Sequence, residues 1–304
     1  MRYILVVVLM LLAFPLQAAP LKVVASFSIL GDLVKQVGDT NVEVQTLVGA
    51  DSDAHVFQPS PADGKKIANA SIVFINGLGF EGWMERLIAS TDYKGNVVVV
   101  SDGIGKTLTM HDEDGHNHTE HDAHARAITD PHAWQNIANT SKYVRNIANA
   151  LSAADPANAK NYLRNADVLD KELSTLDRWV KSEIAKVPAT KRKVISSHDA
   201  FGYFANAYGV AFLAPVGVST EAEPSAKDMK KLIEQIKQNG VRAIFVENMG
   251  SAKLVQQLAS EAGAVVGPTL YADALSKSDG VASSYQAMFK TNVAKIVEAM
   301  RLNQ

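Results

Sequence analysis

The 304-residue chain is close to neutral, with 30 Lys and Arg against 32 Asp and Glu, and it contains no cysteine. This balance gives no support for nucleic-acid binding, which draws on clustered positive charge. The lack of thiols excludes disulfide bonds and thiolate metal ligands, but a chain of this length can bury one or two sizeable cores without them.

The first predicted element is a secretory signal peptide at residues 1–18. Arg2 precedes an apolar run from Tyr3 to Phe14, and small residues follow from Ala18. The run is shorter than the roughly 20 residues that a membrane-spanning helix needs, and its layout is typical of a cleaved export signal. We therefore expect a periplasmic protein, and one that is not lipid-anchored because no cysteine is present to carry the lipid.

Strands then alternate with helices. Apolar runs with the period of a strand are each followed by a stretch with the period of a helix. The predicted strands are 21–27, 41–49, 71–77 and 96–103, and the predicted helices are 29–38, 61–70, 82–90 and 136–154. Such alternation favours a parallel sheet covered by helices, and we assign residues 19–154 to an N-terminal lobe.

A polar, histidine-rich stretch, TMHDEDGHNHTEHDAHAR, interrupts this lobe before the helix 136–154. Its five histidines lie within residues 111–124: His111, His116, His118, His121 and His124. The composition cannot pack a core and predicts a loop. Neutral imidazoles can bind metal, but ordering a flexible segment costs about 1–2 kcal/mol per residue. We therefore expect an accessory metal site, weaker than one built on strand ends.

Residues 155–188 are predicted to form a linker. Apolar side chains recur there at steps of three and four residues, with no proline or glycine between Pro156 and Pro188. This pattern indicates one amphipathic helix, roughly 45 Å long at about 1.5 Å per residue. A helix of that length between two α/β halves would act as a rigid connector.

The second half, residues 189–304, repeats the alternation. The predicted strands are 191–198, 210–218, 241–249 and 264–273, and the predicted helices are 200–209, 225–240, 251–263 and 283–300. The predicted fold class is therefore α/β, with two lobes, each a parallel sheet covered by helices, bridged by one long rigid helix.

Three histidines outside the loop, His55, His132 and His198, stand at predicted strand-to-helix junctions, and Asp273 ends the last predicted strand. Ligands of parallel sheets bind beyond the carboxyl ends of the strands, so side chains from both lobes could converge there. Each residue alone is better explained as a capping or hydrogen-bonding group. Taken together, three imidazoles and one carboxylate fit tetrahedral zinc.

The mature chain resembles the cluster A-I family, the periplasmic metal-binding proteins of zinc and manganese ABC importers. The resemblance rests on HVFQPSP at His55, DPHAW at His132, SSHDAFGYF at His198, STEAEPSA around Glu223 and YADALS at Asp273. It implies two lobes joined by a long helix and metal ligands at His55, His132, His198 and Asp273. Manganese-type members generally carry Glu at the position of His198, so the resemblance favours zinc as the transported ligand.

Other residues near these motifs are candidates of second rank. Carboxylates that could orient ligand imidazoles are Asp130, Glu223 and Glu247, although an ordinary helix cap or surface ion pair is the better explanation of each one. Aromatic side chains that could exclude water are Phe57, Trp134, Phe201 and Tyr203, with plain core packing as the alternative.

The resemblance also implies partners: an ABC permease and its ATPase. We expect a monomer that delivers zinc to them, and the histidine-rich loop could capture zinc or accept it from a periplasmic chaperone. The loop could equally be a dispensable insertion. Alternatives are a manganese or iron carrier of the same family, and a zinc hydrolase using three histidines and a water. The sequence disfavours the hydrolase because it has no H-E-x-x-H motif and Asp273 would fill the position of the water.

Overall fold

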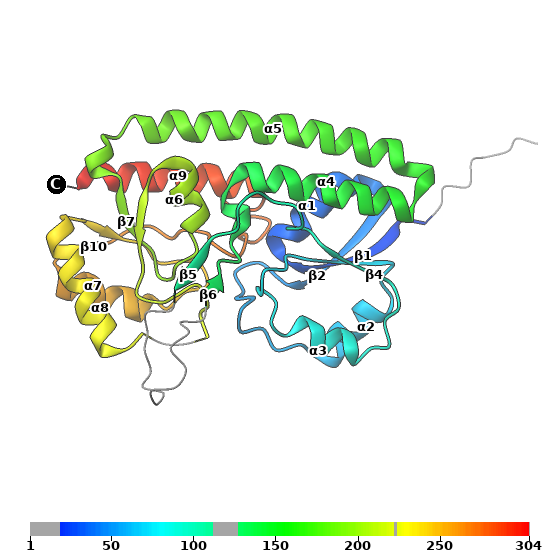
Figure 1. Ribbon diagram of the computed structural model, residues 1–304, viewed down its shortest axis with the longest axis horizontal. Coiled ribbons are helices and arrows are strands. Elements are labelled where there is room, and N and C mark those ends of the chain that lie inside the picture. Colours follow the sequence, from blue (N-terminus) through cyan, green and yellow to red (C-terminus); the bar gives the residue numbers. More distant parts are fainter. Residues whose placement is uncertain (1–18, 112–126, 222–223, 304) are drawn as a thin grey trace, which may run out of the picture.

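The computed structural model describes residues 19–111, 127–221 and 224–303. This part of the chain contains two four-stranded sheets, one from each half of the sequence. Figure 1 shows them side by side beneath a long helix that extends over both. The predicted fold class, two α/β lobes bridged by one long helix, is confirmed.

The N-terminal sheet has the strand order β2-β1-β3-β4, and its neighbouring strands are parallel. Its strands are β1 (Leu21–Phe27), β2 (Val42–Val48), β3 (Ile72–Ile75) and β4 (Asn96–Val99). The helices of this lobe are α1 (Ser28–Gly38), α2 (Pro61–Ala68), α3 (Met84–Ala89) and α4 (Ile137–Ala154). The 3-10 turn η1 (Asp39–Asn41) connects α1 to β2. The last five residues of β1 are all buried because neighbouring strands flank it and helices cover it.

The C-terminal sheet has the order β10-β9-β7-β8, again with parallel neighbours. Its strands are β7 (Lys193–Ile195), β8 (Ala211–Leu213), β9 (Ala243–Ile244) and β10 (Val265–Val266). The helices are α6 (Gly202–Tyr208), α7 (Ala226–Asn239), α8 (Ala252–Ala262) and α9 (Tyr285–Leu302). These strands are shorter than predicted, but isolated bridges join His198 to Val216 and Glu247 to Leu270 beyond their ends.

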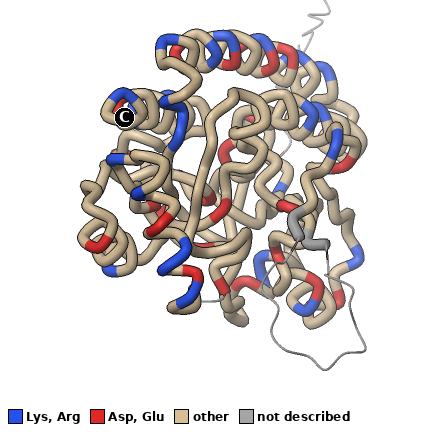
Figure 2. The backbone as a smooth tube through the Cα atoms, turned by 60° about the vertical axis from the view of Figure 1, so that its left-hand side comes forward, with Lys and Arg blue, Asp and Glu red and all other residues tan. Residues whose placement is uncertain are grey.

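The long helix α5 (Ala159–Ala185) follows the 3-10 turn η3 (Pro156–Asn158), and a second turn, η4 (Ala189–Lys191), leads into β7. The buried positions of α5 recur at three- and four-residue steps: Tyr162, Ala166, Leu169, Leu173, Leu176, Val180 and Ile184. Helix α9 packs against α5 and contacts both α1 and β7, so it also connects the two lobes. Figure 2 shows Lys/Arg and Asp/Glu interspersed along α5, and none of these charged residues is among its buried positions.

A small antiparallel sheet, β5 (Thr109–His111) and β6 (Ala127–Thr129), joins the two ends of the histidine-rich segment. The sequence predicted a loop from residue 111 onward. The backbone of His111 instead belongs to β5 and pairs with Ala127.

One large hydrophobic core runs through both lobes and includes side chains as distant in sequence as Val24, Leu173 and Phe289. A second, smaller core lies between α7, α8 and the C-terminal sheet and includes Leu232 and Leu258. The layer of α7 and α8 is therefore packed separately from the main body. Among the described residues, no helix combines the length and apolarity needed to cross a membrane.

Candidate metal centre

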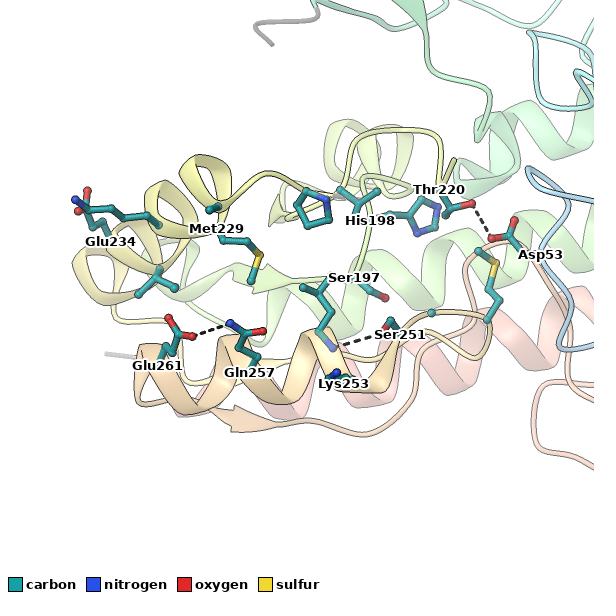
Figure 3. Close-up of a pocket in the computed structure, with 18 of the residues that line it drawn as sticks. Asp53, Ser197, His198, Thr220, Met229, Glu234, Ser251, Lys253, Gln257 and Glu261 are labelled. Atoms are coloured by element: carbon teal, nitrogen blue, oxygen red, sulfur yellow. Dashed lines mark hydrogen bonds between the residues drawn. The ribbon is translucent and has the colours of Figure 1, made fainter. Parts of the chain in front are cut away.

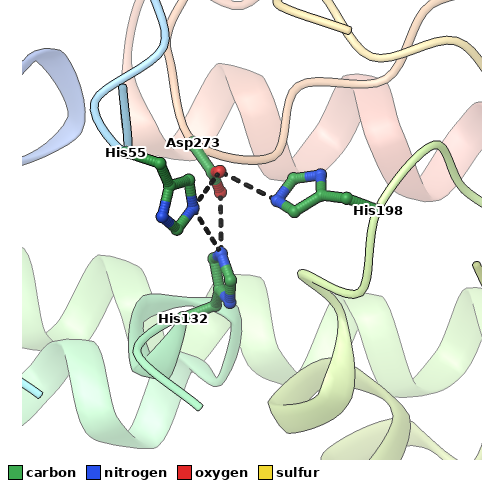
Figure 4. A group of neighbouring side chains, drawn as sticks. All are labelled: His55, His132, His198 and Asp273. Atoms are coloured by element: carbon green, nitrogen blue, oxygen red, sulfur yellow. Dashed lines mark hydrogen bonds and ion pairs between the residues drawn. The ribbon is translucent and has the colours of Figure 1, made fainter. Parts of the chain in front are cut away.

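His55 lies in the segment between β2 and α2. Its backbone N–H donates to Asp53 Oδ1 at 2.8 Å, which fixes the local turn of the chain. The imidazole packs against the ring of Phe80, with centroids 4.7 Å apart. The residue is 7% exposed and its Nε2 points toward the interior between the lobes (Figure 4).

His132 follows β6 and precedes the 3-10 turn η2 (Ala133–Gln135). Asp130 Oδ1 accepts the backbone N–H of His132 at 2.9 Å and lies 2.8 Å from Nδ1 of the same residue. A carboxylate at Nδ1 favours a proton on that nitrogen and leaves Nε2 for a metal. The other oxygen of Asp130, Oδ2, lies close to the backbone of Gly202 in α6. A Cβ atom at position 202 would come within 2.6 Å of this oxygen, so a glycine is needed there for Asp130 to keep its position.

His198 lies between β7 and α6, and Glu247 holds it in the same way. Glu247 Oε2 is 2.5 Å from His198 Nδ1. Its Oε1 accepts the backbone N–H groups of Ser197 at 3.0 Å and His198 at 3.1 Å. Both oxygens of this buried carboxylate are therefore used to orient one imidazole.

Asp273 lies just beyond Leu270 and is fully buried. The carbonyl of the preceding residue, Ala272, accepts hydrogen bonds from Trp134 Nε1 at 3.0 Å and Gln135 Nε2 at 2.8 Å. The segment that carries Asp273 is thus attached directly to the turn that follows His132.

The four side chains converge between the lobes, as Figure 4 shows. Asp273 Oδ2 lies 3.3 Å from His55 Nε2 and 3.0 Å from His198 Nε2, and Oδ1 lies 3.5 Å from His132 Nε2. The Nε2 atoms of His55 and His132 are 3.3 Å apart, and one ligand atom from each residue lies within 4.8 Å of all the others. Tetrahedral zinc with bonds near 2.0–2.1 Å separates its ligand atoms by roughly 3.3 Å.

Burial and charge act against each other in this cluster. Burial alone would lower the pKa of His132, but Asp273 and Asp130 outweigh it and raise that pKa to about 9. Glu247 and Asp273 likewise overcome burial and raise the pKa of His198 well above 6.5. Burial would raise the pKa of Asp273, but the two imidazoles hold it well below its usual range. Both histidines are therefore protonated in the metal-free protein at pH 7, and a metal ion must displace two protons.

The four aromatic candidates divide between the two alternatives that the sequence left open, contact with the site and plain core packing. Trp134 does pack on His132, with centroids 5.3 Å apart. Phe57 instead packs on Trp83, and Phe201 stacks on Phe212. The hydroxyl of Tyr203 accepts the backbone N–H of Leu108 at 3.1 Å.

The sequence did not single out Phe80, whose ring contacts both His55 and His132. Next to it, Glu81 is buried and accepts hydrogen bonds from Ser26 Oγ and the backbone N–H groups of Asn76 and Gly77. These bonds fix the loop that presents Phe80. An apolar residue in a loop carries no spacing signal that would have identified it.

Several predicted residues lie outside the described part of the chain. They are His116, His118, His121 and His124 of the loop, and Glu223. The accessory metal role of the loop therefore stays a prediction.

Comparisons with known proteins agree with this architecture. The family described as zinc-uptake complex component A, periplasmic (ZnuA), matches residues 23–299. The chain is 30% identical over 286 residues to the manganese ABC transporter substrate-binding lipoprotein PsaA of Streptococcus pneumoniae, covering 92% of this chain and 89% of that protein.

Two solved structures show the same likeness in three dimensions. A mutant, manganese-bound periplasmic metal-binding protein from Candidatus Liberibacter asiaticus has a TM-score of 0.81 at 33% identity, covering 92% of this chain and 99% of that chain. The periplasmic zinc-binding protein TroA from Treponema pallidum has a TM-score of 0.82 at 28% identity, with the same coverage. The chain therefore belongs to the ZnuA-like family and is the periplasmic metal-binding component of an ABC importer.

Proposed function

We propose that this protein binds Zn²⁺ through His55, His132, His198 and Asp273 and delivers it to an ABC permease driven by its ATPase. The observation that carries the proposal is the convergence of three imidazole Nε2 atoms on one buried carboxylate. Asp273 is fully buried, and the imidazole Nε2 atoms of His55, His132 and His198 face its two oxygens. A buried carboxylate is costly unless it is paired or coordinates a cation, so either protonated imidazoles or a metal ion must balance its charge.

The donor set supports zinc over manganese. Imidazole nitrogen suits Zn²⁺, whereas Mn²⁺ prefers carboxylate and other oxygen ligands and binds a given site more weakly. In addition, Asp130 and Glu247 occupy the Nδ1 sides of His132 and His198, an arrangement that fixes the tautomer for metal binding through Nε2.

A manganese carrier is the second candidate. It is favoured by the relatives, because PsaA is named for manganese and the Liberibacter structure is manganese-bound, while TroA is named for zinc. The zinc hydrolase alternative receives no such support, since the family consists of substrate-binding components of importers, which are not enzymes.

We further propose that the mature protein is free in the periplasm. The curated relatives are named lipoproteins, but the 304 residues of this chain contain no cysteine to carry a thioether lipid. The histidine-rich loop, in this proposal, captures zinc and passes it to the centre.

The test is a titration of the mature protein with Zn²⁺ and, separately, Mn²⁺ against chelators of known affinity. We expect one tight zinc site per chain and much weaker manganese binding. His198→Ala should abolish tight zinc binding, while His118→Ala, a matched change in the loop, should not. Tighter manganese than zinc binding would establish the second candidate, and tight zinc binding that survives His198→Ala would contradict the proposed ligand set.

A further inference from the structure

A cavity of about 950 Å³ lies between α7 and α8 and reaches the metal centre. Met229 and Leu254 line its walls, and His198 and Ser197 lie at its inner end. Figure 3 shows His198 there together with Thr220 and Asp53. Because His198 is only 2% exposed and the other three candidate ligands are also buried, a metal ion cannot leave without some movement of the chain. The cavity offers space for such a movement next to His198.

The carboxylate of Asp53 connects the lobes at this end of the cavity. Its Oδ1 accepts the backbone N–H of His55 at 2.8 Å. Its Oδ2 accepts the hydroxyl of Thr220 at 2.7 Å, and Thr220 comes from the segment that follows β8 in the other lobe. One side chain thus joins the backbone of a candidate ligand to the opposite lobe.

A second cross-lobe hydrogen bond lies two residues away on the same segment. Asn248 Nδ2 donates to Asp51 Oδ1 at 2.9 Å. The backbone N–H of Asp51 also donates to the carbonyl of Leu275 at 3.0 Å. These two bonds hold the segment at Asp51, four residues before His55. The Asp53–Thr220 bond holds the same segment closer to His55 and therefore closer to the metal centre.

We propose that Thr220 is a positioning residue for cargo retention: by bonding to Asp53 it holds His55 against the C-terminal lobe and slows the escape of the bound metal. This inference rests on the proposed function, because it concerns the same centre. Separation of Thr220 from Asp53 would release the His55 segment on the side where the cavity already meets His198.

The experiment measures metal dissociation from the full mature protein by stopped flow, with excess chelator and Zn²⁺ as the cargo. Thr220→Val keeps the shape of the side chain but removes the donor. We expect the dissociation rate to rise about tenfold, the factor that corresponds to one hydrogen bond to a charged acceptor. Thr220→Ser restores the hydroxyl and should restore slow dissociation.

Two controls separate retention from a general loss of structure. Thr175→Val removes an exposed hydroxyl that donates to Lys171 O and accepts from Arg178, all within α5, and should leave the dissociation rate unchanged. The d–d absorption of the Co²⁺-loaded Thr220→Val variant should match the parent, because its ligands are intact. If Thr220→Val folds poorly, Asn248→Ala loosens the same segment and should also accelerate dissociation.

A dissociation rate of Thr220→Val within twofold of the parent, with zinc bound tightly by both, would overturn this inference alone. A parent protein that binds no zinc would overturn both proposals. An altered Co²⁺ spectrum would also overturn it, because Thr220 would then act on the ligand set itself and not on retention.

Discussion

Replacing Glu247 with glutamine should weaken zinc binding, because both carboxylate oxygens accept from N–H groups and an amide has only one oxygen that can accept. Oε1 accepts two backbone N–H groups, and Oε2 faces His198 Nδ1. Glutamine keeps one acceptor and turns the other into an N–H donor. If its oxygen stays with the backbone, its NH₂ faces Nδ1.

The size of the expected loss of zinc affinity follows from the tautomer of His198 in the metal-free and in the zinc-bound variant. In the metal-free variant, a neutral His198 can accept from the amide at Nδ1 and keep its proton on Nε2. Zinc requires the Nε2 lone pair, so the proton must move to Nδ1 and meet the amide N–H. A buried donor left unpaired costs about 1–3 kcal/mol, which agrees with the roughly 10–100-fold loss of metal affinity typical of such substitutions.

Two readouts test this reasoning in Glu247→Gln. Competition with a chelator should show the loss of zinc affinity. Calorimetry in several buffers at pH 7 should show about one proton released per zinc in place of two. The reason is that the pKa of His198 falls without Glu247. Glu183→Gln, which removes an exposed ion pair with Lys186 on α5, is the matched control and should change neither. Affinity within threefold of the parent, with unchanged proton release, would refute the assigned role.

Three further outcomes are expected. Zinc binding by the parent should release about two protons at neutral pH, from His132 and His198, so affinity should rise up to about a hundredfold per pH unit and less steeply above pH 9, where His132 no longer carries its extra proton; a flat profile would contradict this. The pKa of His132 rises on folding from about 6.5 to about 9, so its contribution to the stability of the metal-free protein is complete below pH 6.5 and disappears as pH rises through 9. The urea midpoint of that protein should therefore fall over this window. Replacing residues 112–126 by a two-residue turn, which the pairing of His111 with Ala127 allows, should leave zinc affinity within about threefold; a tenfold loss would assign tight binding to the loop.

Three residues of the centre could be found from the sequence because they lie beyond the carboxyl ends of parallel strands. His55 follows β2, His198 follows β7, and Asp273 follows the bridge between Glu247 and Leu270 in the same sheet as β7. Parallel strands bring their carboxyl ends together whatever their order. The position of His132 does not follow from this rule, because His132 comes after β6 of the small antiparallel sheet.

The remaining features depend on contacts that have no local pattern. The hydrogen bond between Thr220 and Asp53 joins residues far apart in the chain, and a threonine in a polar loop is common. The second connection between the lobes, through α9, was missed because an amphipathic helix at the end of a chain indicates burial but not its partners. The short strands β9 and β10 differ from their predictions because apolar runs overestimate strand length wherever turns also bury side chains.

The charges of the centre suggest how one site can bind metal tightly and still release it. Three carboxylates, Asp130, Glu247 and Asp273, surround His132 and His198, and both imidazoles carry protons in the metal-free protein. Exchange of two protons for one divalent cation leaves the total charge of this buried cluster unchanged. Since burying net charge is what costs most in a low-dielectric interior, the lobes can stay closed in both states. Metal transfer then depends on the rate at which protons replace the cation, and on the hydrogen bonds that must open before they can.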